Sequence, residues 1–234
     1  MKIRLSHHEP LLEARHIKRR SRNDDTWLLR ETSLCLQPGD RVVLTGPSGG
    51  GKTVLLRALA SLDPLESGQL LWRGSPLLGS GVPGFRCQVI YLHQKPVLLE
   101  GSVEHNLRLP YSLQMHREAV YDHSLMVKQL SQMARGADFL DLPVRTLSGG
   151  ESQLVAVLRA VQLKPVVLLL DEPTAALDEN GTRAIEQLIL DWYEKIPGQR
   201  AFIWVSHDRQ QAKRVATRFW HVDQGEITER SSLS

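Results

Sequence analysis

Short apolar runs along the chain predict a set of buried strands. Four of them consist mostly of apolar residues and lie at 41–45, 88–92, 166–170 and 201–205. A strand that is covered on both faces of a parallel sheet has this continuous apolar character. Nearer the N-terminus, 11–17 and 32–37 are expected to form two shorter strands, and the charged stretch RRSRNDD between them is expected to be an exposed turn.

Apolar positions between these runs recur at helical spacing. One apolar helix is predicted over about 53–62. Two amphipathic helices are predicted from two further sets of positions: Leu154, Val157, Leu158 and Val161, and then Ile185, Leu188, Ile189 and Trp192. Strands that alternate with helices imply an α/β fold with a doubly wound, mainly parallel sheet. In such sheets ligands bind beyond the carboxyl ends of the strands.

Residues from about 95 to 147 do not continue this alternation. They contain few β-branched runs and several stretches with helical character, such as 116–134. We interpret them as a mostly helical insert within a single domain that spans 1–234. The core of that domain is then formed by about 1–94 and 148–234.

Composition and charge restrict the range of partners. The 234 residues carry 29 basic and 26 acidic side chains, a formal net charge of +3. This charge is too small to suggest nucleic acid, and it suits anionic ligands or work near an anionic membrane face. No apolar run is long enough to span a bilayer, and the polar start MKIRLSHHEP does not resemble a secretory signal. We therefore expect a cytosolic chain whose membrane role would depend on another polypeptide.

The two cysteines, Cys35 and Cys87, lie far apart in segments that resemble strands. No paired spacing of Cys or His suggests a zinc site. We expect two buried thiols in a reducing compartment.

A glycine-rich loop follows the strand at 41–45 and precedes the first apolar helix. It fits the pattern of a glycine, four residues and then Gly-Lys-Ser/Thr, with Gly46, Pro47, Ser48, Gly49, Gly50, Gly51, Lys52 and Thr53. Glycines let successive backbone N–H groups turn inward around an anion, and the helix that follows points its positive end at the same place. Lys52 can then reach the β- and γ-phosphates of a nucleotide, and the Thr53 hydroxyl can bind Mg²⁺. The loop predicts phosphate binding but does not by itself distinguish kinases, GTPases and ATPases.

Two carboxylates end the apolar strand at 166–170. Asp171 and Glu172 are adjacent, so their side chains are expected to face opposite ways and to serve different tasks. Asp171 suits the Mg²⁺ site, directly or through water, and Glu172 can polarise the water that attacks the γ-phosphate. A strand end that meets solvent with two charges is common, and it is the phosphate loop that favours the functional interpretation.

A second glycine-rich sequence, LSGGE at 147–151, stands just before a predicted helix. The N-terminus of a helix offers another anion site. A single phosphate cannot contact both glycine-rich loops of one chain if they are far apart. A second copy of the chain resolves this, because the loop of one copy can close over the ATP that the other copy holds.

With these motifs the sequence resembles the ABC ATPase family over most of its length. LSGGE is similar to the family signature, Gln94 to the glutamine of the Q-loop, AALD at 175–178 to the D-loop, and His207 to the switch histidine. The resemblance implies an α/β P-loop NTPase core with a mainly parallel sheet. It also implies an N-terminal antiparallel β subdomain, a helical insert specific to the family, and hydrolysis of ATP with Mg²⁺.

The resemblance also implies roles for individual residues. Glu172, His207 and Gln94 are expected to be catalytic, with Gln94 sensing Mg²⁺ and the attacking water and His207 contacting the γ-phosphate. Thr53, Gln94 and Asp171 are expected at the metal. The remaining nucleotide contacts are expected from the signature, acting on the ATP of the second subunit, and from the D-loop: Ser148, Gly149, Gly150 and Asp178.

Two positions depart from the family pattern. The family often has an aromatic residue before the phosphate loop that stacks on adenine, and alignment of LEARHIKRR places Arg19 there. An arginine plane can stack on a base, and Trp27 can substitute for it, so both are candidates. Leu154 stands where the helix after the signature often has arginine, which affects local contacts and not the ATP site.

Three stretches resemble one branch of the family more closely, namely ASLDPLESGQL, RCQVIYLHQ and EGSVEHNLRLP. This branch contains the stand-alone ATP-binding subunits of bacterial exporters linked to iron export, and plant relatives linked to aluminium tolerance. It implies an integral membrane permease subunit that docks on about 95–147, and a peripheral location on the inner face of the membrane. ATPase subunits of lipoprotein-release and amino-acid transporters share most of these motifs.

Two other classes of function stay open. A non-transport ABC ATPase, such as a cell-division regulator, would bind DNA, ribosomes or septal proteins without a membrane partner. A P-loop kinase acting on a small molecule is disfavoured by the joint presence of LSGGE, AALD and His207.

Overall fold

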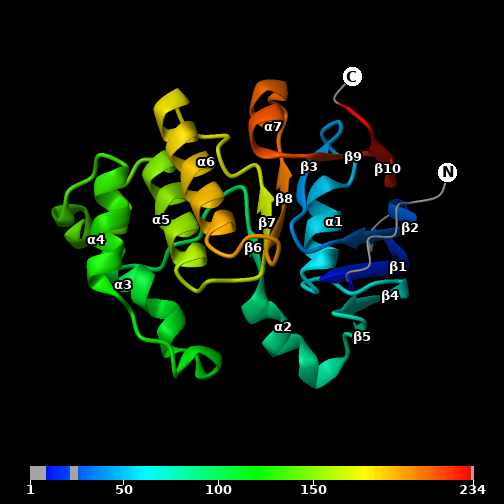
Figure 1. Ribbon diagram of the computed structural model, residues 1–234, viewed down its shortest axis with the longest axis horizontal. Helices are drawn as coiled ribbons and strands as arrows, with labels where there is room; N and C mark the ends of the chain where they lie inside the picture. Colours follow the sequence, from blue (N-terminus) through cyan, green and yellow to red (C-terminus); the bar gives the residue numbers. More distant parts are fainter. Residues whose placement is uncertain (1–8, 22–25, 233–234) are drawn as a thin grey trace.

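A six-stranded sheet forms the centre of the computed structural model, which describes residues 9–21 and 26–232 (Figure 1). Its order is β10-β9-β3-β8-β7-β6, and every pair is parallel except the antiparallel pair of β9 and β10 at one edge. The strands are β3 (Arg41–Thr45), β6 (Val89–Leu92), β7 (Val167–Asp171), β8 (Ala201–Val205), β9 (Arg218–Asp223) and β10 (Glu226–Arg230). The four strands predicted from apolar runs are confirmed, and β6 and β7 begin one residue later than expected.

Helices cover both faces of this sheet, which explains why its strands are apolar throughout. Leu168 and Leu170 of β7 enter one hydrophobic core, whereas Val167 and Leu169 enter the core on the opposite face. The first core is shared with α5 and α6, and the second with α1, as their positions in Figure 1 indicate. The helices of the core fold are α1 (Lys52–Leu59), α5 (Gly149–Val161), α6 (Glu179–Glu194) and α7 (Arg209–Val215).

A smaller antiparallel sheet of order β2-β1-β4-β5 lies beside α1 (Figure 1). Its strands are β1 (Leu12–Arg20), β2 (Trp27–Leu36), β4 (Ser67–Trp72) and β5 (Ser75–Pro76). The antiparallel N-terminal sheet is confirmed, although β1 and β2 are longer than expected and β4 and β5 were not predicted. Residues 22–25 of the predicted turn lie outside the described residues. The Arg30 N–H donates to the Gly225 carbonyl over 2.9 Å, which joins β2 to the end of the larger sheet.

Residues 95–147 carry two helices and several short 3₁₀ turns, and they lie beside α5 (Figure 1). The helices are α3 (Val103–Arg108) and α4 (His123–Gln132), and the turns are Leu109–Ser112, Gln114–His116, Ala137–Asp141 and Val144–Thr146. The helix expected over 116–134 starts later, because Asp122 caps α4 by accepting from the Leu125 N–H over 2.9 Å. In the described part of the chain, no helix has the length and apolar character needed to cross a membrane.

The environment of the cysteines differs from the prediction. Cys87 lies in a short helix, α2 (Val82–Gln88), which begins with Pro83 in its first turn, and not in a strand. Cys35 lies in β2 as expected. Both thiols are free and only half-buried.

Candidate functional site

The phosphate loop connects the end of β3 to the start of α1, and three of its glycines, Gly46, Gly49 and Gly51, have a positive φ. Gly46 and Gly51 have φ values of 144° and 109°, which other residues rarely adopt. A Cβ atom on Gly46 would lie 1.9 Å from the Val222 carbonyl oxygen, and one on Gly51 would lie 2.9 Å from the Leu28 oxygen. The loop is therefore held tightly between β9 and β2.

Lys52 fills the inside of this loop. Its Nζ donates to the carbonyl oxygens of Gly46 over 2.9 Å and Pro47 over 2.8 Å, and the residue is only 7% exposed. Burial lowers the pKa of Lys52, and the nearby carboxylates of Glu172 and Asp171 oppose that shift. The ammonium thus marks a place where phosphate oxygens can replace the two carbonyls.

The end of β7 is tied directly to the phosphate loop. The Thr53 hydroxyl donates to Asp171 Oδ2 over 2.7 Å, and the Tyr91 hydroxyl of β6 donates to the same oxygen over 3.0 Å. Burial, followed by the charge of Asp171, raises the pKa of Tyr91, which therefore stays a neutral donor. Tyr91 was not predicted, because an aromatic residue within an apolar strand has the sequence character of a core residue.

Glu172 directly follows β7, and its carboxylate contacts two further residues that were predicted for the site. Gln94 Nε2 donates to Glu172 Oε2 over 2.8 Å, and His207 Nε2 lies 2.9 Å from Glu172 Oε1. Glu172 itself has φ 48°, a left-handed backbone that costs on the order of 1–3 kcal/mol in a residue other than glycine. The structure thus brings Glu172, Gln94 and His207 into one hydrogen-bonded group, next to Asp171.

A buried polar network supports the loop that carries His207. Ser206 Oγ donates to Gln211 Oε1 over 2.7 Å, and Gln211 Nε2 donates to Thr174 Oγ1 over 3.0 Å and to Glu186 Oε1 over 3.1 Å. Arg214 completes the network with two hydrogen bonds to the Glu186 carboxylate. The network joins the end of β8 to the segment just after Glu172. It therefore fixes the backbone next to His207 relative to the backbone next to Glu172.

The signature sequence caps α5. Ser148 Oγ accepts from the Glu151 N–H over 3.2 Å, and Glu151 Oε2 accepts from the Ser148 N–H over 2.9 Å, a reciprocal capping box. The Ser148 N–H is the main cause that lowers the pKa of Glu151. In the D-loop, Asp178 caps α6 by accepting from the Gly181 N–H over 2.7 Å. At the start of each of these two helices, the capping side chain therefore accepts from a backbone N–H of the first turn.

The signature and the D-loop line the same groove. Gly150 lies so close to the D-loop that a Cβ atom there would be 2.7 Å from the end of the Leu177 side chain. A groove of about 820 Å³ runs along this surface and is lined by Ser148, Gly149, Gly150, Leu177 and Asp178, among others. Within residues 9–21 and 26–232, no hydrogen bond or ion pair connects this groove to the phosphate loop or to Glu172.

The two candidates for contact with a nucleobase lie in different surroundings. Arg19 forms a 2.7 Å ion pair with Asp63, which also pairs with Arg57 at the end of α1 remote from the phosphate loop. Trp27 directly precedes Leu28, whose carbonyl oxygen touches the loop at Gly51. The guanidinium of Arg20 lies 4.2 Å from the centre of the Trp27 ring. Of the two candidates, Trp27 is the one whose neighbour in the sequence lies against the phosphate loop. Leu154, the other departure, is buried in the core around α5.

The fold and the phosphate loop define a P-loop nucleotide-binding protein. The sequence profile of the ABC transporter family matches residues 29–175, from β2 to just beyond Glu172. The chain is 34% identical over 187 residues to the probable iron export ATP-binding protein FetA of Escherichia coli K12, covering 80% of this chain and 81% of that protein. It is also 34% identical over 220 residues to protein STAR1 of Oryza sativa subsp. japonica, covering 94% of this chain but only 62% of STAR1.

A solved structure agrees with the sequence comparison. The bacterial ABC transporter cassette MJ0796, solved as a dimer, superposes with a TM-score of 0.81 and 25% sequence identity, covering 94% of this chain and 97% of that one. The chain belongs to the ABC transporter family, and it is an ATP-binding, ATP-hydrolysing subunit of that family.

Proposed function

We propose that the chain works as a homodimer that binds two ATP molecules between its subunits and drives a separate membrane permease. The observation that carries the ATP-hydrolysing part of this proposal is the joined group at the strand ends. Glu172 is bonded to Gln94 and lies beside His207, and its neighbour Asp171 is bonded to Thr53 of the phosphate loop. Groups from four separate segments thus meet where a γ-phosphate would lie.

The phosphate loop is proposed to bind the nucleotide. N–H groups of residues 48–51 are directed at the phosphates, and Lys52 exchanges its contacts with Gly46 and Pro47 for the β- and γ-phosphate oxygens. Trp27 is proposed to stack on adenine. Lys52 offsets the negative charge that develops in the transition state.

The same residues fit a Mg²⁺ ion. Thr53 and Asp171 present a hydroxyl and a carboxylate oxygen only 2.7 Å apart, and Gln94, which is bonded to the adjacent Glu172, is proposed to add its amide oxygen. The described residues contain no group of three or more His, Cys, Asp or Glu side chains that would hold a metal alone. This suits an ion that is shared with nucleotide phosphates, because Mg²⁺ usually keeps few protein ligands there. When bound, it would polarise the phosphoryl oxygens.

Glu172 is proposed to act as the general base on the attacking water. Each of its two carboxylate oxygens has one partner in this arrangement, Gln94 for one and His207 for the other, and a second lone pair that can accept a proton from water. We infer that bound ATP draws His207 to the γ-phosphate and Gln94 to the metal and the water.

The signature groove is proposed to receive the ATP of the second subunit. Gly149 and Gly150 supply N–H groups at the start of α5, and Ser148 and Asp178 line the same groove. The dimeric form of the similar cassette MJ0796 supports this arrangement. Closure excludes water from the two sites, and loss of the γ-phosphate then favours opening.

The membrane permease is proposed to dock on residues 95–147, beside the Q-loop. A groove of about 670 Å³ there is lined by Pro96, Leu98, Gly101 and Val144, among others. Val97 and Leu99 beside it are large apolar residues that are 70% and 55% exposed. An apolar surface of this kind suits a partner, and its nearness to Gln94 in the sequence links it to the ATP site.

An export function linked to iron is the finer proposal, and it is supported by the resemblance to FetA, which is described as a probable iron export ATP-binding protein. The chain would then lie peripherally on the cytoplasmic face of the membrane, where its permease holds it. Nothing in the nucleotide site identifies the cargo, which the permease would bind.

The test is to purify the tagged chain from gently solubilised membranes of its own cells and to identify what accompanies it. We expect a polytopic membrane protein together with ATPase activity that falls at least about tenfold in Glu172→Gln, a variant that retains ATP binding. Recovery with ribosomes, DNA or septal proteins and no membrane protein would contradict the transporter proposal. Equal turnover in Glu172→Gln would contradict the role of Glu172.

A further inference from the structure

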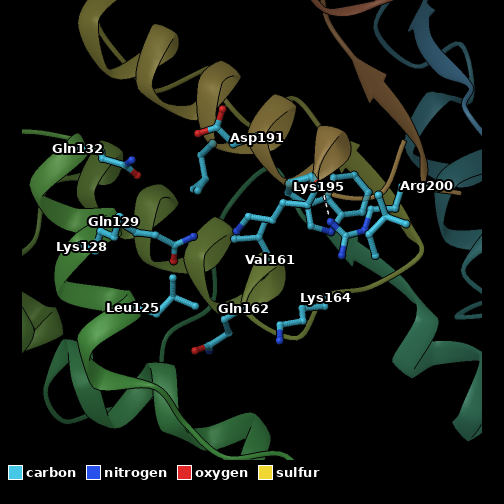
Figure 2. A pocket seen from close by; sticks show the side chains of 13 residues that line it. Leu125, Lys128, Gln129, Gln132, Val161, Gln162, Lys164, Asp191, Lys195 and Arg200 are labelled. Atoms are coloured by element: carbon cyan, nitrogen blue, oxygen red, sulfur yellow. Dashed lines mark hydrogen bonds between the residues drawn. The ribbon is translucent and has the colours of Figure 1, made fainter. Parts of the chain in front are cut away.

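A cavity separate from the two grooves described above lies away from the nucleotide site, between α4, α5 and α6 (Figure 2). It encloses about 300 Å³, which is at the lower end of the range for small-molecule sites. Apolar side chains form part of its wall, namely Leu125, Val161, Leu188, Trp192 and Ile196. The cavity therefore offers an apolar surface that suits a ring or a short branched chain.

Polar atoms buried in the wall of this cavity have no partner within the described residues. They are Gln129 Oε1, Gln162 Oε1 and Trp192 Nε1, and the three residues are only 8%, 7% and 3% exposed. Gln162 is held in place from its other end, because its Nε2 donates to the Leu107 carbonyl over 2.7 Å. Buried polar atoms without partners are costly, but these three are sealed from solvent, so a bound molecule contacts them only after the side chains turn toward the cavity.

A buried arginine gives the cavity a positive wall. Arg200 is 3% exposed, donates to the Trp192 carbonyl and lies 5.1 Å from the centre of the Trp192 ring. Burial lowers the pKa of Arg200, and no carboxylate of the described residues forms an ion pair with it. A buried cation without an anionic partner is rare, because desolvation of the charge is not offset.

The rim of the cavity adds to this positive charge. Lys128, Lys164 and Lys195 line it, and none of them forms an ion pair with another residue of the described ranges. Asp191 is the one lining residue with a carboxylate, and it accepts from Gln187 Nε2 over 2.6 Å. With Arg200, four cationic groups face one carboxylate. Figure 2 shows Lys128 and Gln129 on one side of the cavity and Lys195 and Arg200 on the other.

We propose that this cavity binds a small organic acid with an aromatic or branched apolar body and a single carboxylate. The apolar body packs between Leu125, Val161 and Leu188, and the carboxylate accepts from the Arg200 guanidinium, with the lysines of the rim adding to its attraction. Inorganic phosphate would leave the apolar wall unused, and a neutral apolar molecule would leave Arg200 without a counter-charge. This site is separate from the ATP site and does not depend on the proposed transport function.

The bound acid would connect two parts of the chain. One wall, with Leu125 and Gln129, belongs to α4 within residues 95–147, whereas Leu188 and Trp192 belong to α6 of the core. A ligand that contacts both walls restrains α4 relative to α6 and stabilises the native chain by mass action. The site therefore has two readouts, affinity and thermal stability, neither of which requires ATP turnover.

The test uses calorimetric titration of the full chain with indole-3-acetate and, as a matched neutral probe, indole-3-acetamide. We expect the acetate to bind and the acetamide to bind about tenfold more weakly, a difference of about 1.4 kcal/mol. Val161→Phe fills the cavity and should abolish binding. Lys128→Gln should weaken binding about threefold, whereas Lys213→Gln, which removes an exposed lysine from α7 outside the cavity, should leave it unchanged.

The titrations distinguish results that support the proposed site from results that contradict it. Binding of the acetate that is lost in Val161→Phe and weakened in Lys128→Gln supports the proposal, as does a matching rise in melting temperature. Absence of acetate binding, equal affinity for acetate and acetamide, or equal effects of Lys128→Gln and Lys213→Gln would each overturn it. Because Lys128 and Lys213 are both exposed, this last comparison does not depend on whether Val161→Phe folds.

Discussion

The two glycine-rich loops of this chain are similar in composition and different in structure. In the phosphate loop, Gly46 and Gly51 have positive φ values, and the loop closes around the buried ammonium of Lys52. In the signature, neither Gly149 nor Gly150 has a positive φ, and both lie at the start of an ordinary helix. The first loop needs glycine for its backbone conformation, whereas in the second only Gly150 is crowded, and its neighbour is the movable end of the Leu177 side chain.

This difference indicates which loop can work alone. The phosphate loop is bonded through Thr53 to Asp171, next to Glu172, so its chemistry is assembled within one chain. The signature faces a groove and, across the described ranges, has no hydrogen bond to those residues. We infer that the first loop binds ATP in a single chain and that the second requires the ATP of another copy.

The largest effect is expected from Lys52→Ala. Loss of the ammonium removes the positive charge that offsets the γ-phosphate, so ATP turnover should fall by at least about a hundredfold. ATP affinity should fall as well, because the loop loses the group at its centre. Steady-state ATPase assays and nucleotide titration measure both quantities, with Lys213→Ala as the control. Turnover within about threefold of the unaltered chain would show that the phosphate loop has been misinterpreted.

A smaller effect, on stability, should separate the two kinds of glycine. Gly46→Ala places a Cβ atom 1.9 Å from the Val222 carbonyl oxygen, so the free energy of unfolding should fall by about 3 kcal/mol or more. Gly150→Ala meets only the movable end of Leu177, so the change in stability should stay within about 1 kcal/mol. Urea denaturation measures both. Equal losses of unfolding free energy in the two variants would contradict the view that Gly46 is needed for its backbone conformation and Gly150 is not.

The smallest of these effects concerns adenine. Trp27→Ala should raise the KM for ATP about five- to tenfold, in keeping with the loss of one stacked base. Arg19→Ala breaks the ion pair with Asp63 and should lower stability without changing that KM. A larger change of the KM for ATP in Arg19→Ala than in Trp27→Ala would indicate that Arg19, the residue placed there by alignment, contacts adenine.

The sequence predicted the parallel sheet well because its strands are buried on both faces. Runs such as VVLLL have no other common explanation, and β3, β7 and β8 were placed within one residue. The edge strands β9 and β10 were missed because they mix exposed and buried positions; in β9 only Trp220 and Val222 are buried. The helix over 116–134 was predicted too long because its polar start carries no apolar period.

Within the site, contacts that depend on three-dimensional register were beyond sequence reasoning. The pairing of β1 with β2 shifts register three times between Ala14 and Arg20, and His16 has φ 51°. The first shift places an extra residue in β1, beside His16, and reverses the alternation of its two faces, so counting along LEARHIKRR could not tell which side Arg19 occupies. The hydrogen bond from Tyr91 to Asp171 could not be predicted either, because it depends on the pairing of β6 with β7, which the sequence does not show.

The most direct test of the account measures the mass of Glu172→Gln in solution with and without ATP, by sedimentation. Because this variant should retain ATP without hydrolysing it, we expect ATP to convert single chains into pairs with one nucleotide per chain. Addition of Ser148→Arg to Glu172→Gln should abolish the pairing and spare ATP binding, since Ser148 lies in the groove that receives the second nucleotide. A variant that binds ATP and stays a single chain, or a double variant that still pairs, would contradict the shared site.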